Sequence, residues 1–549
     1  MSLTIDTNGL KFVIFASGHD YTLADSGDGD VQIFSHPFVP LNSVNYAGQY
    51  YFMVPDENGD PLDAVKDDIA HCTFTPALGT AFDTEGEAVV SVNYHREYIH
   101  DEETIVVDKT VSQTIQVVNH GSVTTSASNY DQYSDGYCFI RPISVNSVGS
   151  IGYTLGTINS ATKLSSIPWR QTELGRGIYP FIQRANSLTD ISELQYADTS
   201  KVVRLIFSAY VSLLEDITPL ANWNTSNVTQ MGSLATYSKV KNLKALKKWN
   251  VSKVTTFDSF CYRMNDLESL EGLEDWNVEN VEYLNSFCLS CPALKDISAL
   301  LNWNTEKLVS VNAMLSGCSG LLSLHGLENW NAENVTDMSY MCNGCSGIVS
   351  LDPLLNWKAK PTTIDYAFRN CSKIQTIEGL ANLDLSQCTS MIYAFEGCSR
   401  LLSLHGSEDW DTSKVTNFLH AFYNDFWISD ISAIDNWDFS SAVNMQSMFG
   451  FVCALLSLDD VDLDLSNVTA SDGLKGMFMT TDFGYYPAGD CEVYFYNYGW
   501  VDYAGNWYSQ VGNIVNVYTK SASNAENWNV SISGADSFTA QWSNIPSWN

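Results

Sequence analysis

The sequence predicts a mainly β fold, in which a solenoid of about ten coils of 26–27 residues follows an N-terminal β-sandwich-like domain. Three observations predict it. Tryptophan recurs at a fixed interval through the middle of the chain, and leucines recur there at every third residue. The first 118 residues lack this period and contain alternating apolar and polar residues, a pattern typical of strands.

The tryptophans lie 26 or 27 residues apart, with Leu383 and Leu463 taking the same place in two copies and Tyr196 one copy earlier. A fixed period of this length is the signature of a solenoid. We therefore expect the tryptophans to stack in one column as a structural ladder. Its members are Trp223, Trp249, Trp276, Trp303, Trp330, Trp357, Trp410 and Trp437.

Other rows of residues recur with the tryptophans. Val or Leu follows five residues after the Trp place, an apolar residue follows after eight, and an Asn or Asp comes directly after it. One coil cannot bury its inner face alone, so each is stabilised by its neighbours and the ends need caps. The Asn and Asp side chains are expected to form a stacked ladder that satisfies backbone groups of the turns.

The segments WNTSNVTQM (223–231), WNAENVTDM (330–338) and WDTSKVTNF (410–418) carry a family resemblance. They resemble the BspA-like leucine-rich repeat, found in bacterial surface lipoproteins and adhesins, over roughly residues 190–480. The resemblance implies a leucine-rich-repeat solenoid that serves binding or adhesion, and it brings no catalytic residues.

Four regions are expected along the chain. Residues 1–118 form a β-sandwich that loosely resembles an immunoglobulin-like module and serves as an attachment domain. Residues 119–165 form a connector with some strand around 136–145, residues 166–480 the solenoid, and residues 481–549 an aromatic-rich cap.

The composition limits the partners. A formal charge of −35 opposes nucleic acid and anionic membranes, and no apolar segment is long enough to span a bilayer. Two acidic turns, 25–30 and 56–63, are better explained as hairpin turns than as calcium sites. We expect no cofactor and no metal, and the chain lacks the common sequence motifs of enzymes.

The thirteen cysteines are expected to be free. Five of them share one place in successive copies. Two others, Cys288 and Cys342, lie three residues before members of this row and form C-x-x-C pairs with them at 288–291 and 342–345. In-register stacking keeps the side chains parallel, which does not suit disulfides, and the two pairs lie too far apart for a shared zinc. Buried thiols that pack as small apolar groups are favoured over metal or redox chemistry.

Two surfaces are candidates for ligand binding. The first is an aromatic face in the tail, where alternating rings share one side of a strand; its residues are Tyr494, Tyr496, Tyr498, Trp500, Tyr503 and Trp507. Packing of this face on the last coil is the alternative. The second is a solvent-facing stripe with His325, Asp352 and His405, for which an ordinary solvated surface is the alternative.

These features favour a non-enzymatic binding or structural protein. A chain without a secretory signal or an anchor is expected to be a phage virion appendage, which attaches to other virion proteins through its N-terminal domain and recognises a host-surface glycan or protein. The alternative is a bacterial cell-surface adhesin of the BspA-like kind. A homo-oligomer is compatible with both.

Overall fold

A computed structural model gives the structure of the chain, and its described residues fall into two compact units, 1–253 and 254–549. The described residues are 38–45, 53–55, 61–63, 71–100, 103–127, 130–140, 155–165, 181–197, 199, 202–208, 210–452, 454, 463–465, 477, 494–496, 499–501, 507–509, 516–518 and 530–532. Their regular elements are short strands and 3-10 helices, with no α-helix among them, which agrees with the predicted mainly β class. No helix in these ranges is long and apolar enough to cross a membrane.

The strands of the first unit are β1 (Phe38–Pro40), β2 (Met53–Pro55), β3 (Pro61–Asp63), β4 (Cys72–Thr75), β5 (Gly86–His100), β6 (Glu103–Val118), β7 (Val123–Ser126), β8 (Tyr130–Tyr133), β9 (Tyr137–Ile140), β10 (Gly156–Thr157), β11 (Lys163–Leu164), β12 (Ile182–Arg184), β13 (Arg204–Ile206) and β14 (Gln230–Gly232). Its 3-10 helices are η3 (Ser192–Tyr196), η4 (Thr218–Leu220) and η5 (Lys244–Leu246).

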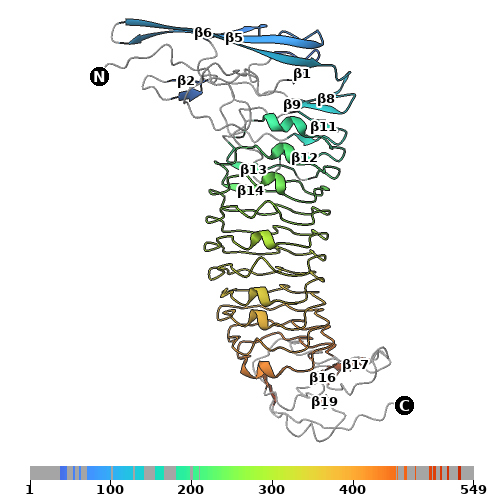
Figure 1. Cartoon of the computed structure of the whole chain (residues 1–549). Helices are drawn as coiled ribbons and strands as arrows, with labels where there is room; N and C mark the ends of the chain where they lie inside the picture. Colours follow the sequence, from blue (N-terminus) through green and yellow to red (C-terminus); the bar gives the residue numbers. More distant parts are fainter. Residues whose placement is uncertain are drawn as a thin grey trace. The chain divides into compact units, whose positions relative to one another are not determined.

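The N-terminal region is built on the long hairpin of β5 and β6 (Figure 1), which pairs from Gly86↔Val117 to His100↔Glu103. With β1 and β4 it forms a four-stranded sheet in the order β1-β6-β5-β4. Alternate β-branched residues such as Val90 and Val92 are buried, as expected for a half-buried strand. A second four-stranded sheet, in the order β11-β9-β8-β7, is formed by strands beyond residue 118, so the described part of residues 1–118 holds one four-stranded sheet and the β2–β3 pair, and the β-sandwich stays a prediction.

Parallel pairing at the repeat interval begins upstream of residue 166. Tyr137 in β9 pairs with Lys163 in β11, which in turn bridges Asp190, at intervals of 26 and 27 residues. These early copies lack the tryptophan that marks later ones, so the alignment on tryptophan does not detect them. β9 falls inside the strand predicted around 136–145.

Hydrogen bonds, an ion pair and a ring stack link the residues of these early copies. The Tyr137 hydroxyl donates to Glu193 Oε2 at 2.7 Å, and Lys163 Nζ lies 3.2 Å from Glu193 Oε1. The His120 ring stacks on Tyr137 at 3.7 Å, and its Nδ1 lies 2.7 Å from Asp135. Glu193 is buried, and these two partners compensate its loss of hydration.

The second unit contains the 3-10 helices η6 (Ser298–Leu300), η7 (Asp352–Leu354), η8 (Glu378–Leu380) and η9 (Ser432–Asn436). Its strands are β15 (Leu463–Leu465), β16 (Tyr494–Tyr496), β17 (Gly499–Val501), β18 (Trp507–Ser509), β19 (Asn516–Tyr518) and β20 (Val530–Ile532). β15 pairs with β20 in parallel.

Residues 254–452 repeat one backbone course, which Figure 1 draws as successive coils. One column of parallel bridges runs Thr256↔Tyr283↔Ser310↔Asp337↔Thr363↔Ser390↔Asn417↔Asn444. Directly after this column every second N–H donates to the next copy: the N–H groups of Phe257, Ser259, Cys261 and Arg263 bond to the carbonyls of Tyr283, Asn285, Phe287 and Leu289 at 2.7–3.0 Å. Backbone groups that face a neighbouring copy are thereby paired.

Two left-handed backbone positions, four residues apart, recur in these copies. The first position, which we call the upper turn position, has φ between 49° and 59° at Ser259, Ser286, Ala313, Tyr340, Tyr366, Tyr393, His420 and Ser447. The second, the lower turn position, holds Arg263, Ser290, Gly317, Gly344, Asn370, Gly397, Asn424 and Phe451. Their chirality bends the chain tightly enough to keep each copy 26–27 residues long.

Candidate functional site

The predicted tryptophan ladder is made of buried, nearly parallel rings. In the first unit Trp223 and Trp249 stack at 6.4 Å. In the second unit the centres of successive rings lie 5.8–6.4 Å apart along the series Trp276, Trp303, Trp330 and Trp357. The ring centres of Trp410 and Trp437 lie 5.7 Å apart. Leu383 occupies the place between Trp357 and Trp410, so the row of rings is interrupted there.

The indole nitrogens explain why this place holds tryptophan. Each of seven indoles donates to a backbone carbonyl 29 or 30 residues earlier, at 2.8–3.2 Å; the donors are Trp223, Trp249, Trp303, Trp330, Trp357, Trp410 and Trp437. A buried indole N–H without a partner is unfavourable. Tryptophan therefore fills the core and satisfies a carbonyl of the preceding copy.

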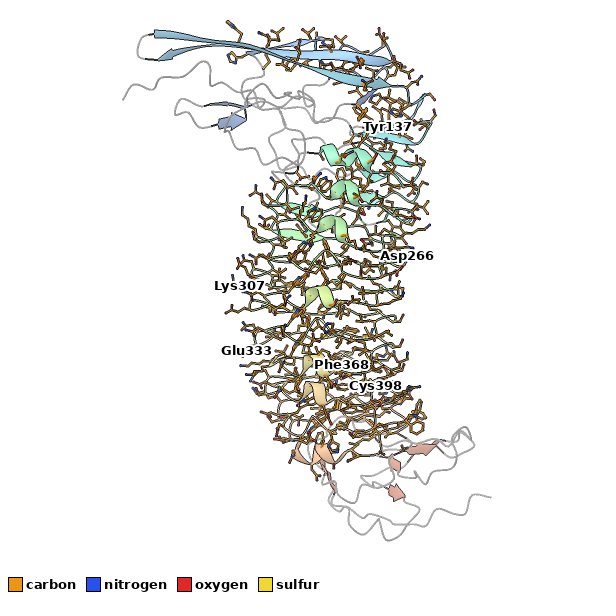
Figure 2. All side chains as sticks on the ribbon, viewed as in Figure 1. Tyr137, Asp266, Lys307, Glu333, Phe368 and Cys398 are labelled. Carbon is orange, nitrogen blue, oxygen red and sulfur yellow. The ribbon has the colours of Figure 1, made fainter. Side chains whose placement is uncertain are left out.

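The cysteines of the shared place make a comparable bond. Their Sγ atoms donate to a carbonyl 29 or 30 residues earlier at 2.9–3.2 Å, in Cys291, Cys318, Cys345, Cys371 and Cys398. Figure 2 labels one such pair, Cys398 and Phe368. The ten buried cysteines of the described ranges are free thiols, and within these ranges no three His, Cys, Asp or Glu side chains gather as a metal site. Burial raises the pKa of the Cys398 thiol well above its usual value.

The Asn and Asp residues after the tryptophan place act within their own turns rather than between copies. Each Oδ1 accepts the N–H of the residue two positions later at 2.7–3.2 Å, in Asn224, Asn250, Asn277, Asn304, Asn331, Asp384, Asp411 and Asp438. This is an Asx turn. The expected ladder between copies is replaced by a local bond that serves the same backbone groups.

The predicted histidine stripe also consists of local turns. His325 Nδ1 lies 2.6 Å from Glu328 Oε1, and the second oxygen of Glu328 accepts the N–H of Gly326 at 2.7 Å. His405 and Glu408 repeat this arrangement at 2.8 Å. The glutamate thus satisfies a turn whose glycine has a left-handed backbone, φ 115° at Gly326.

In the described part of the chain no ion pair joins the predicted members His325, Asp352 and His405 to one another. His405 Nε2 instead lies 3.1 Å from Asp430 of the next copy. The hydrogen bond to Glu408 holds the pKa of His405 above its usual value, against partial burial and with help from Asp430. The side chains are exposed, so these pairs contribute little stability.

The aromatic face predicted in the tail divides between two antiparallel strand pairs. Tyr494 and Tyr496 lie in β16, which pairs with β19, whereas Trp500 lies in β17, which pairs with β18 and places Val501 opposite Trp507. The structure therefore has two strands where the alternation predicts one. Tyr498 and Tyr503 are outside the described residues, as are the side chains of this segment, and ligand binding there stays a prediction.

A second aromatic feature lies on the upper turn position. Tyr340 and Tyr366 stack at 4.5 Å with an angle of 5°, Tyr366 and Tyr393 at 4.9 Å with 15°, and His420 follows Tyr393 at 4.8 Å. We call these four residues the aromatic column. The His420 ring in turn stacks on Tyr423 at 4.3 Å. Tyr340, at one end, is 38% exposed, and the other three rings are half-buried.

One arginine crosses the column. The Arg369 guanidinium carbon lies 5.6 Å from the centre of the Tyr366 ring and 5.4 Å from that of Tyr393, within the range of cation–π attraction. Its Nε also donates to Glu396, which is buried. Burial raises the pKa of Tyr366 above its usual value, so its hydroxyl is protonated and available as a donor at neutral pH.

Sequence reasoning had a signal for this column and missed it. The upper turn position lies two residues after the apolar row that follows the tryptophan place by eight residues. From 259 to 447 it holds Ser, Ser, Ala, Tyr, Tyr, Tyr, His and Ser. Aromatic residues in four successive copies at a surface position are informative. The row is not apolar and periodic like the core rows, so a search for core patterns passes over it.

The repeats also match a family model. The family described as "Mycoplasma protein of unknown function, DUF285" matches residues 181–299, 292–403 and 362–483. A comparison with curated proteins gives no match. Because the matched segments together cover residues 181–483, more than half of the 549 residues, the chain belongs to the DUF285 family.

Proposed function

We propose that the protein is a non-enzymatic binding protein whose repeats form a leucine-rich-repeat solenoid of the BspA-like kind and display a surface for recognition or adhesion. The observation that carries the proposal is the aromatic column, a row of stacked rings that is exposed at Tyr340 and half-buried in its other members. Large exposed aromatic groups at one place are typical of ligand and partner sites.

The repeat construction supports this function. In most copies tryptophan, cysteine and aliphatic residues fill the core places, and the tryptophans and cysteines bond to the adjacent copy, which leaves the surface places free to vary. A host-surface glycan or protein is the proposed partner. The formal charge of −35 disfavours polyanions such as nucleic acid.

Two settings call for this kind of surface. The family description names Mycoplasma, and the resemblance to the BspA-like repeats of bacterial surface proteins favours the surface of a bacterial cell. The free thiols of the ten buried cysteines in the described ranges favour a particle assembled in a reducing cytoplasm, such as a phage virion, with the N-terminal domain as its attachment point. Mass spectrometry of purified particles and of washed cell-surface fractions separates the two settings.

Adhesion can be measured directly with the full chain. Beads coated with the protein should adhere to host cells more than beads coated with albumin, and soluble protein should compete for the same sites. Equal retention of both kinds of beads would contradict a recognition function, whichever setting the protein occupies.

A further inference from the structure

The aromatic column has one open end. Tyr366 and Tyr393 each lie between two rings, and His420 is covered by Tyr423, so the faces of these inner rings are occupied. Among the described residues Tyr340 stacks on one ring only, that of Tyr366. One face of Tyr340 is therefore the platform on which a further ring can stack, while the inner rings offer their edges and hydroxyls.

The backbone conformation argues that these tyrosines are retained for their rings. A left-handed position suits glycine or asparagine and is unfavourable for a bulky residue. In five successive copies the lower turn position follows this rule, with Gly317, Gly344, Asn370, Gly397 and Asn424, whereas the outer copies carry Arg263, Ser290 and Phe451. The upper turn position of the same copies instead carries Tyr340, Tyr366 and Tyr393 with φ of 54–58°. Turn geometry alone does not select tyrosine there.

Small residues lie beside the open face. The upper turn position of the preceding copy holds Ala313, whose N–H bonds to the carbonyl of Ser339 at 2.8 Å, so the two copies are adjacent at this point. The lower position there is Gly317, and the copy before has Ser286 and Ser290. Rings at this position stack 4.5–4.9 Å apart along the column, so the place next to Tyr340 has the width of one ring but carries only a methyl group.

The groups around this place are polar and uncharged or acidic. Asn312 is half-buried and donates to Asp337 at 3.2 Å, and Asn343 donates to the Ser316 hydroxyl at 3.3 Å. Their amide oxygens and the Tyr340 hydroxyl can bond to a ligand's hydroxyls. A wholly apolar ligand ring is disfavoured because it would remove water from these groups without giving them hydrogen-bond partners. An anionic ligand is disfavoured because the negative charge of the chain would repel it. A pyranose has an apolar face for the tyrosine and hydroxyls for the rim.

We propose that the open face of Tyr340, above Ala313 and Gly317, binds a neutral pyranose ring of a glycan, which continues the aromatic column by one member. The inference rests on the proposed recognition function and names its ligand class and its site. The hydroxyls of Tyr340 and Tyr366, whose rings lie 4.5 Å apart, lie at the edge along which the rest of the glycan extends.

The periodicity of the chain supplies a blocking variant. In Ala313→Tyr the chain's own ring fills the proposed site, in the backbone conformation that Tyr340 already adopts one copy later. Tyr340→Ala removes the platform, and Tyr340→Phe keeps the ring face. Tyr283 gives a matched control, because it is also a tyrosine with 38% exposure and lies outside the column.

Binding of glucose, galactose, mannose and N-acetylglucosamine to the full chain is measured by saturation-transfer difference NMR, with N-acetyltyrosinamide as an aromatic probe. We expect at least one sugar to bind, and both Tyr340→Ala and Ala313→Tyr to weaken binding about tenfold or more. Tyr340→Phe and Tyr283→Ala should keep binding within a small factor. Thermal unfolding of each variant verifies that it is folded.

Three results overturn the proposal: no sugar binds the native chain, only the aromatic probe binds, or Ala313→Tyr binds sugar as well as the native chain does. Sugar binding that Tyr340→Ala leaves unchanged also overturns this site, while the recognition function stands. The bead assay is a separate measurement, so a failure of sugar binding while adhesion persists refutes the pyranose site and leaves the recognition function standing.

Discussion

At the scale of the residue, Asp425 stands where the five preceding copies carry a cysteine. It is fully buried, and neither carboxyl oxygen has a hydrogen-bond partner among the described residues. Burial raises the pKa of Asp425 well above its usual value, and the nearby Glu396 carboxylate adds to the effect. In the folded protein the neutral acid is therefore the favoured form, whereas in the unfolded chain the pKa is about 3.9.

Replacing this acid by the residue of its own column should stabilise the protein. Asp425→Cys removes a buried carboxyl and supplies a thiol that can donate to the preceding copy, as Cys398 does at 3.1 Å. We expect the free energy of unfolding at pH 7 to rise by about 1–3 kcal/mol. Chemical denaturation of the two proteins under reducing conditions measures it.

The same substitution makes a prediction about pH. A group whose pKa is raised on folding contributes its stability below the unfolded pKa, and that contribution is lost as pH rises toward the folded pKa. The advantage of Asp425→Cys should therefore shrink as pH falls from 7 toward 4. An advantage that is constant across this range would mean that Asp425 does not titrate as its burial demands.

Trp303 tests the tryptophan ladder at the same scale. Its ring lies between those of Trp276 and Trp330, and its indole N–H bonds to the carbonyl of Leu273 at 2.9 Å. Trp303→Ala should lower the free energy of unfolding by about 3–5 kcal/mol through the cavity it leaves. Trp303→Phe keeps an aromatic ring and loses the N–H, so its loss should be smaller. Equal losses would show that the hydrogen bond, not the volume, dominates.

At the scale of the element, each copy combines places that sequence can predict with places that it cannot. The rows of Trp, Val and Met are periodic because inward residues stack on their equivalents, so the period predicts burial. The two left-handed positions have no such signature, since serine, tyrosine, arginine and asparagine all occur there. Hydrogen bonds between adjacent copies hold the backbone in the left-handed conformation. The identity of the residue at that place therefore does not predict the conformation.

The buried thiols report how a copy opens. Cys318 and Cys345 are fully buried and bonded to carbonyls, whereas Cys72 in β4 is half-exposed. Iodoacetamide should modify Cys72 first and the two core thiols only when the copies around them open. Mass spectrometry of the peptides gives the order, and modification of Cys318 at the rate of Cys72 would contradict its place in the core.

At the scale of the whole molecule, predictability from sequence follows the repetition. The middle of the chain contains many copies of one pattern, so a residue type that recurs in most copies stands out from chance. The family match covers this part, residues 181–483. The copies at Tyr137 and Lys163 lack the tryptophan, and only the parallel pairing reveals them. The aromatic tail offers one example of each segment. Alternation there could not distinguish one strand from two short strands that pair with different partners.

Stability of such an array is a sum over copies and their interfaces, which predicts the effect of removing one copy. Deletion of residues 304–330 joins Trp303 to Asn331 and leaves every row in register, because the segment is one full period of 27 residues. The shortened chain should fold and keep its far-UV circular dichroism per residue, with a moderate loss of melting temperature. Deletion of residues 304–316 removes about half a period and joins Trp303 to Gly317, so that core places meet surface places. That variant should fail to fold cooperatively, and similar melting curves for both deletions would refute the nearest-neighbour account.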